Sequence, residues 1–246
     1  MLRRCLEAEW GKLRHSRMWL ILLVLPVLST LIGFANYWMN QAILRNGWYS
    51  LWTQVSLFYG EFFLPILIAI CCAFVCRLEH VNRNWNIVLT APVAVSQVFL
   101  AKVMMVSILI FFVQLFFLAL YICAGFVAGL PAHFTFPPEV FGWIMRGWLA
   151  SLTIIVFQLW LSMRIQSFAL PVGISVCSVF IGLGLYVSGL GLFFPQSLLT
   201  IGMGVLSQDS MTVGELGTFV VMCVLFVTGG CALGIRRLIR ADVMSQ

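Results

Sequence analysis

Glu61 is the residue of this chain whose position most needs a chemical explanation. It is the one acidic residue deep within an apolar stretch, where an ionisable group costs on the order of 2.5–3.5 kcal/mol on insertion scales. Pro65 follows four residues later and lacks the N–H that would bond the Glu61 carbonyl, so we expect the helix to bend or open here. The carboxylate can act as a gate, a substrate contact or a proton site, or it can be a structural group bonded to the next helix.

Arg146 is the second charged side chain that the apolar pattern places near a span, at the start of the stretch 141–163. A long basic side chain there can snorkel to the interface, or it can pair with Glu61 or Glu139. The three histidines fall outside the apolar stretches, and no histidine or carboxylate is spaced with the eight cysteines as a ligand set requires. We therefore predict no metal site.

Motifs for catalysis are missing from the sequence. It has no GxxxxGK[ST] loop for nucleotide phosphates and no GxSxG nucleophile elbow. The net charge of +6 comes without zinc-finger spacing, an RNA-binding signature or a long basic stripe. We predict a protein that is not an enzyme, binds no cofactor itself and does not bind nucleic acid.

The composition points to the membrane as the solvent of this chain. Hydrophobic residues make up 62% and charged residues 9% of 246, against roughly 45–50% and about 25% in soluble domains. Stretches of about 20 apolar residues predict six transmembrane helices in an all-α, polytopic membrane protein with a single domain, 1–246. The spans are expected near 18–38, 52–76, 103–129, 141–163, 168–192 and 216–235.

The basic residues predict the orientation of these spans. If both termini are cytoplasmic, only Arg45 and Arg146 of the 14 Lys and Arg residues lie outside, a strong positive-inside bias. The first apolar run is longer than the core of a signal peptide, so we expect an uncleaved span. Residues 1–17 carry Leu2, Leu6, Trp10 and Leu13 at helical spacing, which predicts an N-terminal amphipathic interfacial helix. An unstructured basic anchor is the alternative.

Two connections between spans are unusual. Arg77 to Lys102 is polar at first and then apolar before Pro92, which predicts a short helix whose apolar face needs a partner or rests on the membrane. Residues 194–214 are too apolar for a solvated loop and predict one or two short helices dipping into the outer leaflet. Two GxxxG pairs predict close helix packing, and they comprise Gly125 with Gly129 and Gly230 with Gly234.

These features together resemble the permease subunits of ABC-2-type transporters. Within that group, the sequence Tyr59-Gly60-Glu61-Phe62-Phe63-Leu64-Pro65 looks like that of the lantibiotic-immunity permeases. So does Leu89-Thr90-Ala91-Pro92-Val93 ahead of Lys102.

The resemblance implies a permease in the bacterial cytoplasmic membrane that works with separate ABC ATPase subunits, which bind ATP and Mg²⁺. A second permease subunit, a related chain or a second copy, completes the assembly. The cargo would be a cationic, membrane-active peptide. Another amphipathic substrate (a drug, lipid or ion) and a membrane sensor without transport remain alternatives. The resemblance also implies a coupling helix that docks on the ATPase, with Glu79, Asn82, Asn84, Trp85, Val88 and Leu89 as contacts.

Overall fold

The computed structural model describes residues 2–14, 16–80, 94–131, 137–206 and 211–243. These residues form helices and turns and contain no strand. Six helical stretches in the described residues are long and apolar enough to cross a membrane. The prediction of an all-α polytopic membrane protein with six spans is therefore confirmed.

The spans are α2 (Met18–Met39), the continuous run α3, η1 and α4, then α6 (Val95–Val127), α8 (Glu139–Arg164), α9 (Ala169–Val187) and α11 (Val213–Val243). The second span consists of α3 (Gly47–Ser56), the π-helical η1 (Leu57–Phe63) and α4 (Leu64–His80). Three short helices complete the described chain: α1 (Leu2–Arg14), η3 (Gly191–Phe193) and α10 (Pro195–Gly202).

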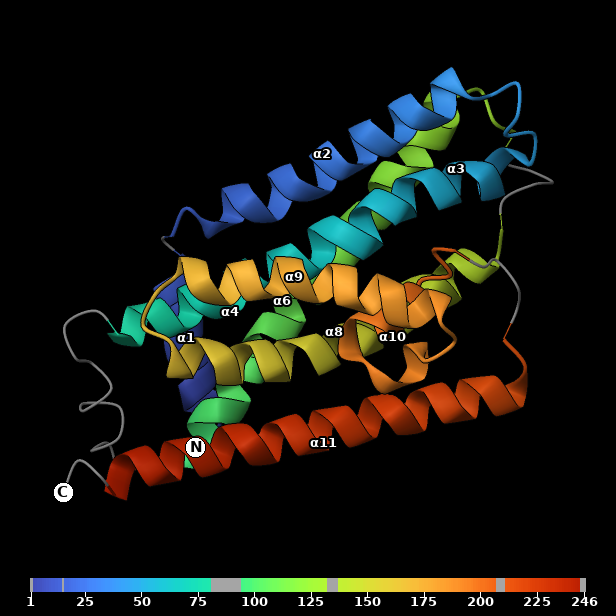
Figure 1. The fold of residues 1–246 in the computed structure, drawn as a ribbon. Coiled ribbons are helices and arrows are strands. Elements are labelled where there is room, and N and C mark those ends of the chain that lie inside the picture. The colour runs from blue at the N-terminus through green and yellow to red at the C-terminus, as the bar shows by residue number, and fades with distance from the viewer. Residues whose placement is uncertain (1, 15, 81–93, 132–136, 207–210, 244–246) are drawn as a thin grey trace.

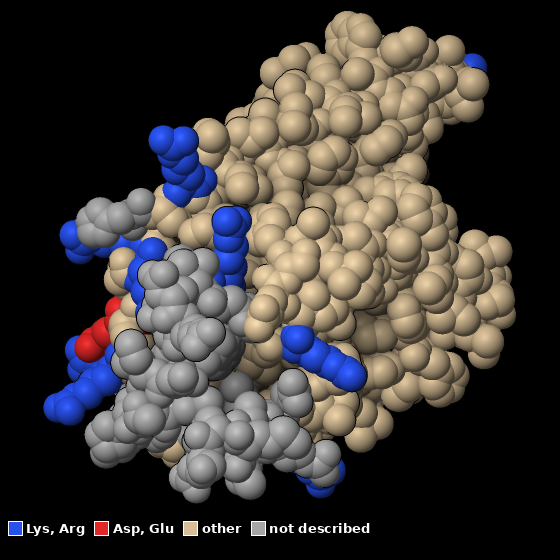
Figure 2. Space-filling model, turned by 60° about the vertical axis from the view of Figure 1, so that its left-hand side comes forward, with Lys and Arg blue, Asp and Glu red and all other residues tan. Residues whose placement is uncertain are grey.

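The long helices run side by side, and the termini lie at the same end of the bundle (Figure 1). We call this the basic end: it holds α1, the start of α2 and α6, and the final turns of α4, α8 and α11. Lys and Arg side chains gather around it (Figure 2). The other end, which holds the start of α8 and α11 and the α9–α10 connection, we call the opposite end; it carries Arg45 and Arg146.

Helix α8 is the central element, packing against α4, α6, α10 and α11. Near the opposite end the core is aromatic: Trp52 stacks on Trp143, with ring centroids 5.1 Å apart, and meets Tyr121 edge-on at the same distance. By contrast, α9 and α11 each bury only 22% of their apolar window inside the chain, against 67% for the span 47–77. Helices α9 and α11 therefore leave most of their apolar surface to lipid or to another subunit.

Two span ends are set by glycine. Gly129 has φ +73°, and its N–H donates to the Phe126 carbonyl. The N–H of Leu130 donates to the Gly125 carbonyl, and the two bonds together form a Schellman cap at the end of α6. A Cβ at Gly129 would meet nothing within 4 Å among the described residues, so Gly129 makes no close contact with another helix of this chain. Gly189, with φ +80°, ends α9 in the same way, which is why that span stops before the expected 192.

The N-terminal residues form a helix rather than an unstructured anchor. Helix α1 packs against α6, and Leu13 is buried while Trp10 stays 42% exposed and meets Trp19 edge-on at 5.7 Å. The apolar connection 194–214 contains the short helix α10, with Pro195 at its first turn. Its Leu198, Leu199 and Thr200 are buried against α8 and α9, so α10 is part of the core.

Candidate functional site

Glu61 lies in the middle of the π-helical segment η1. The N–H of Leu64 donates to the carbonyl of Tyr59, five residues back, and Pro65 has no N–H to restore the α-helical pattern. The Pro65 carbonyl accepts a hydrogen bond from the Ser175 hydroxyl of α9 at 3.2 Å. The helix therefore opens next to Glu61, at the place where the proline predicted a disturbance.

The Glu61 carboxylate is only 3% exposed, and its partner is a neutral hydroxyl. Thr200 Oγ1 of α10 donates to Glu61 Oε2 at 2.6 Å. Among the described residues no ion pair joins Glu61 to a basic side chain, and Arg146 Nε instead donates to the Gly202 carbonyl at 3.3 Å. This geometry favours the structural reading of Glu61, bonded to a neighbouring helix.

Helix α10 is held in place by close approaches at glycines. A Cβ at Gly147 would lie 2.5 Å from the Met203 side chain, and one at Gly60 would lie 2.9 Å from the Met203 sulfur. The indole N–H of Trp52 donates to the Met203 carbonyl at 3.0 Å. These contacts fix α10 between η1 and α8, and so position Thr200.

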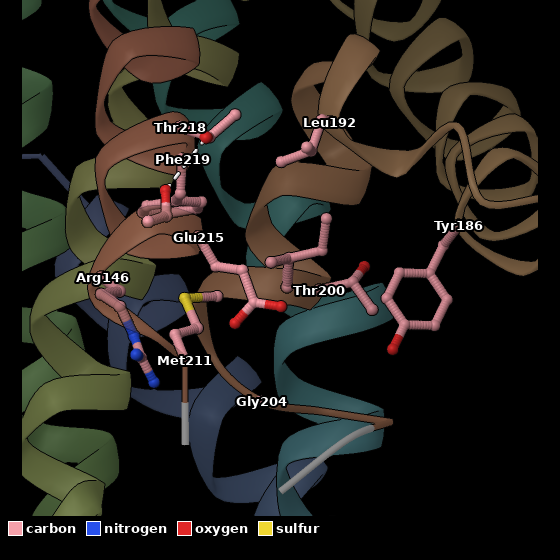
Figure 3. Close-up of a pocket in the computed structure, with 11 residues that line it drawn as sticks. Arg146, Tyr186, Leu192, Thr200, Gly204, Met211, Glu215, Thr218 and Phe219 are labelled. Carbon is pink, nitrogen blue, oxygen red and sulfur yellow. Dashed lines mark hydrogen bonds between the residues drawn. The ribbon is translucent and has the colours of Figure 1, made fainter. Parts of the chain in front are cut away.

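A cavity of about 580 Å³ opens beside α10, between α8, α9 and α11 (Figure 3). Apolar side chains form much of its wall, and among the described residues Arg146 and Glu215 are the charged ones that line it. Glu215 points its carboxylate into the cavity, while Oε2 also accepts from the Thr212 N–H at 2.8 Å as a cap on α11. The lining residues are Arg146, Tyr186, Leu192, Thr200, Ile201, Gly204, Met211, Gly214, Glu215, Thr218 and Phe219.

This cavity has the character of a binding site. Its volume falls in the range of small-molecule sites, roughly 300–1,000 Å³, and the described residues that line it include no histidine or cysteine. Glu61 is not in the lining, but Thr200 connects Glu61 to the cavity. Thr200 lines the cavity, and its hydroxyl donates a hydrogen bond to the Glu61 carboxylate. Of the predicted gate or contact residues Glu61, Pro65 and Arg146, the structure places Arg146 at the cavity and the other two behind it.

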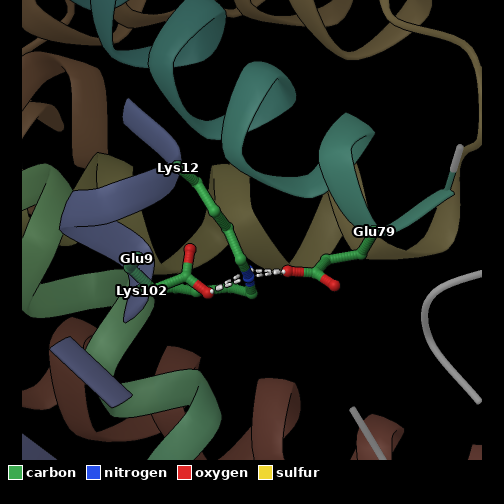
Figure 4. Close-up of polar contacts among 4 residues, drawn as sticks. All are labelled: Glu9, Lys12, Glu79 and Lys102. Atoms are coloured by element: carbon green, nitrogen blue, oxygen red, sulfur yellow. Dashed lines mark hydrogen bonds and ion pairs between the residues drawn. The ribbon is translucent and has the colours of Figure 1, made fainter. Parts of the chain in front are cut away.

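A second polar cluster lies at the basic end, and only one of its members was a predicted site residue (Figure 4). Lys102 of α6 is fully buried and donates to Glu9 Oε1 at 3.0 Å and Glu79 Oε1 at 3.1 Å. Lys12 donates to the same two oxygens at 2.8 Å and 2.5 Å. The four side chains, Glu9, Lys12, Glu79 and Lys102, form a closed ring of alternating charge, which we call the ion-pair ring.

Two members of the ring, Lys12 and Glu79, keep their charges in spite of burial. Burial alone would raise the pKa of Glu79, but Lys102 and Lys12 outweigh it and hold that pKa below its ordinary value. Burial alone would lower the pKa of Lys12, but Glu9 and Glu79 raise it above its ordinary value. Lys12 and Glu79 are therefore both ionised near neutral pH.

The remaining predicted residues are dispersed. Of the ATPase contacts, Glu79 belongs to the ion-pair ring, whereas Asn82, Asn84, Trp85, Val88 and Leu89 lie outside the described residues. The glycines at helix contacts sit against large side chains: Gly125 against Trp48, Gly230 against Val156 of α8, and Gly234 against Phe99 of α6.

The sequence reading missed Glu9, Lys102, Thr200 and Glu215. One signal for Glu9 was available, since it follows the apolar spacing of α1 and has Lys12 three residues later. Nothing local marks Thr200 or Lys102, because their partners are 139 and 93 residues away.

An all-α bundle of six apolar spans, without nucleotide-binding motifs and with a cavity at one end, defines a membrane transport component. The chain belongs to the ABC-2 family of transporter proteins, whose family model matches residues 5–182. It is accordingly a membrane-embedded permease rather than an ATPase, and its family works with an ABC ATPase. No curated protein matches the chain. The matched range includes the whole ion-pair ring, whereas the cavity residues from Tyr186 onward lie beyond it.

Proposed function

We propose that this chain is the permease subunit of an ABC exporter that expels a cationic, membrane-active peptide such as a lantibiotic, and so gives resistance or immunity to it. ATP and Mg²⁺ are bound by the partner ATPase. The permease is paired with a second permease, either a related chain or another copy. It lies in the bacterial cytoplasmic membrane with both termini in the cytoplasm.

The observation that carries the proposal is the cavity at the opposite end. Apolar side chains including Leu192, Ile201 and Phe219 line it together with the exposed Glu215 carboxylate, which can bind the positive charge of a ligand that is otherwise apolar. A cavity of about 580 Å³ holds one segment of a peptide rather than a whole one. The cavity would therefore hold one cationic segment while the rest of the peptide stays in the membrane.

The charge distribution supports the orientation. The described Lys and Arg residues of α1, and of the final turns of α4, α8 and α11, share the basic end. By the positive-inside rule that end faces the cytoplasm, so the cavity would face the outer leaflet. This is where a pore-forming peptide would be met before it crosses the membrane.

The test is a susceptibility panel in cells that produce the chain together with its ATPase. We expect protection against a cationic lantibiotic and little protection against a neutral amphipathic drug. Glu215→Gln keeps the cap on α11 but removes the negative charge. It should lower protection, since a cationic segment would lose the carboxylate with which it pairs.

Glu139→Gln is the matched control, because Glu139 lies at the same end, bonds the Tyr49 hydroxyl at 3.0 Å and does not line the cavity. Equal protection in the Glu215→Gln and Glu139→Gln variants would show that the cavity is not where the peptide binds. Protection against the neutral drug alone would favour a permease for another amphipathic substrate.

The ATPase contact has its own test. Charged residues in place of Trp85 and Val88 should abolish co-purification with the ATPase and stimulated hydrolysis, because the apolar face of that segment would be lost. Normal coupling in this variant would show that the segment 79–89 is not the docking site.

A further inference from the structure

The ion-pair ring joins three parts of the chain that are far apart in sequence. Glu79 is next to the last residue of α4, Lys102 lies two turns into α6, and Glu9 and Lys12 come from α1. Residues 81–93 connect α4 to α6, so the ring ties together the two helices from which that segment leaves. Helix α1 contributes half of the ring.

Glu9 is the member on which this tie to α1 depends. Lys102 is fully buried, and the carboxylates of Glu9 and Glu79 lie within 3.1 Å of its ammonium group. Without the negative charge of Glu9, two ammonium groups would compete for Glu79 Oε1, which lies 2.5 Å from one and 3.1 Å from the other. Repulsion between them would drive α1 from α6 or α4 from α6.

We propose that Glu9 is a positioning residue for the segment between α4 and α6, and that through the ion-pair ring α1 sets how well the ATPase engages the permease. The inference rests on the proposed function in one respect, namely that this segment is where the ATPase docks. Glu9 itself touches neither nucleotide nor cargo.

The expected size of the effect follows from a population argument. If the ends of α4 and α6 are held together in only about a tenth of the molecules, the apparent affinity of a partner that needs them together falls about tenfold. The maximal hydrolysis rate at saturating ATPase stays the same, because a saturating partner restores the competent arrangement. A folding defect would instead lower the maximal rate and leave the midpoint unchanged.

The experiment compares Glu9→Gln with Glu7→Gln in the full-length chain. Glu7 is on the same helix and pairs with Arg3 at 2.9 Å, but this pair is exposed, so the same chemical change there serves as the control. One measurement is hydrogen exchange at the ends of α4 and α6 in the chain alone. The other is the titration of stimulated hydrolysis with the ATPase that co-purifies with the wild-type chain.

We expect Glu9→Gln to speed exchange at both helix ends and to shift the titration midpoint about tenfold, with Glu7→Gln like wild type in both. Reversing all four charges (Glu9→Lys, Lys12→Glu, Glu79→Lys and Lys102→Glu) preserves the alternation and should restore the midpoint. Reversing Glu9 and Lys102 alone creates two pairs of like-charged neighbours, one with Lys12 and one with Glu79, and should not restore the midpoint.

An unchanged midpoint in Glu9→Gln would overturn the proposal, whatever the exchange data show. A wild-type chain that does not stimulate its ATPase would instead contradict the proposed function, and the exchange comparison would then still decide whether Glu9 holds the helix ends together.

Discussion

The two ends of the bundle stabilise buried carboxylates in different ways. At the basic end, Glu9 and Glu79 are balanced by two ammonium groups within 3.1 Å. At the opposite end, Glu61 is nearly as buried but has the hydroxyl of Thr200 as its partner. A full counter-charge holds three chain segments in one arrangement, whereas a single neutral hydrogen bond between η1 and α10 can be broken and remade at lower cost. The difference suggests a rigid end that receives force and a looser end that meets cargo.

The largest effect should come from removing the counter-charge at the basic end. Lys102→Ala leaves the carboxylates of Glu9 and Glu79 sharing Lys12 alone, and losing one partner of a buried ion pair costs about 3–5 kcal/mol. We expect a clear fall in the thermal unfolding midpoint of the purified chain in detergent. Arg3→Ala, which breaks an exposed pair, is the control and should change little.

A midpoint for Lys102→Ala close to that of Arg3→Ala would show that the basic end is no more rigid than its surface. The contrast between the two ends would then be lost.

A smaller effect is expected at the opposite end. Thr200→Val keeps the shape of the side chain but leaves Glu61 without its hydroxyl donor, which costs about 1–3 kcal/mol for a buried polar group. Glu61→Gln keeps an acceptor for Thr200 and removes the charge, so it should cost less than Thr200→Val. Thermal unfolding of the two variants in the same detergent measures the difference.

If Glu61→Gln proved the more damaging change, the negative charge of Glu61 would matter more than its hydrogen bond. The opposite end would then resemble the basic end, and a cation held near Glu61 would have to be sought.

The sequence predicted the long-range architecture better than the polar sites. Six apolar runs fix six spans almost regardless of context, because lipid requires each span to satisfy its own backbone. Glu61 and Pro65 were visible because a carboxylate and a proline are both exceptional inside an apolar run. Lys102 was taken only as an orientation signal, since a lysine at the edge of a span normally reaches water.

The polar sites depend on tertiary contacts that leave no local pattern. The partner of Glu61 is a threonine on a short helix that packs into the core, and nothing near Thr200 in the sequence indicates this. Gly129 shows that one spacing can serve two purposes: its GxxxG spacing predicted packing, and within this chain the residue lies past the end of α6, where a positive φ is needed.

The smallest expected effect is that of pH on the ion-pair ring. The pKa of Glu79 is held below its ordinary value of 4.5, so its stabilising contribution is present above that pH and is lost as pH falls through the folded-state pKa. The pKa of Lys12 is raised above 10.5, so its contribution is present below that pH and is lost as pH rises through the folded-state pKa. Between about pH 5 and 10 Lys12 and Glu79 should therefore contribute a constant amount.

The unfolding midpoint of wild type minus that of the double variant Lys12→Met, Glu79→Gln isolates this contribution, since other titrating groups are common to both chains. We expect the difference to be flat across that interval and to shrink at both extremes. A steady decline between pH 8 and 6 would mean that one of the four groups titrates near neutrality. The basic end would then be a pH-responsive joint rather than a fixed one, and its distinction from the Glu61 end would rest on burial alone.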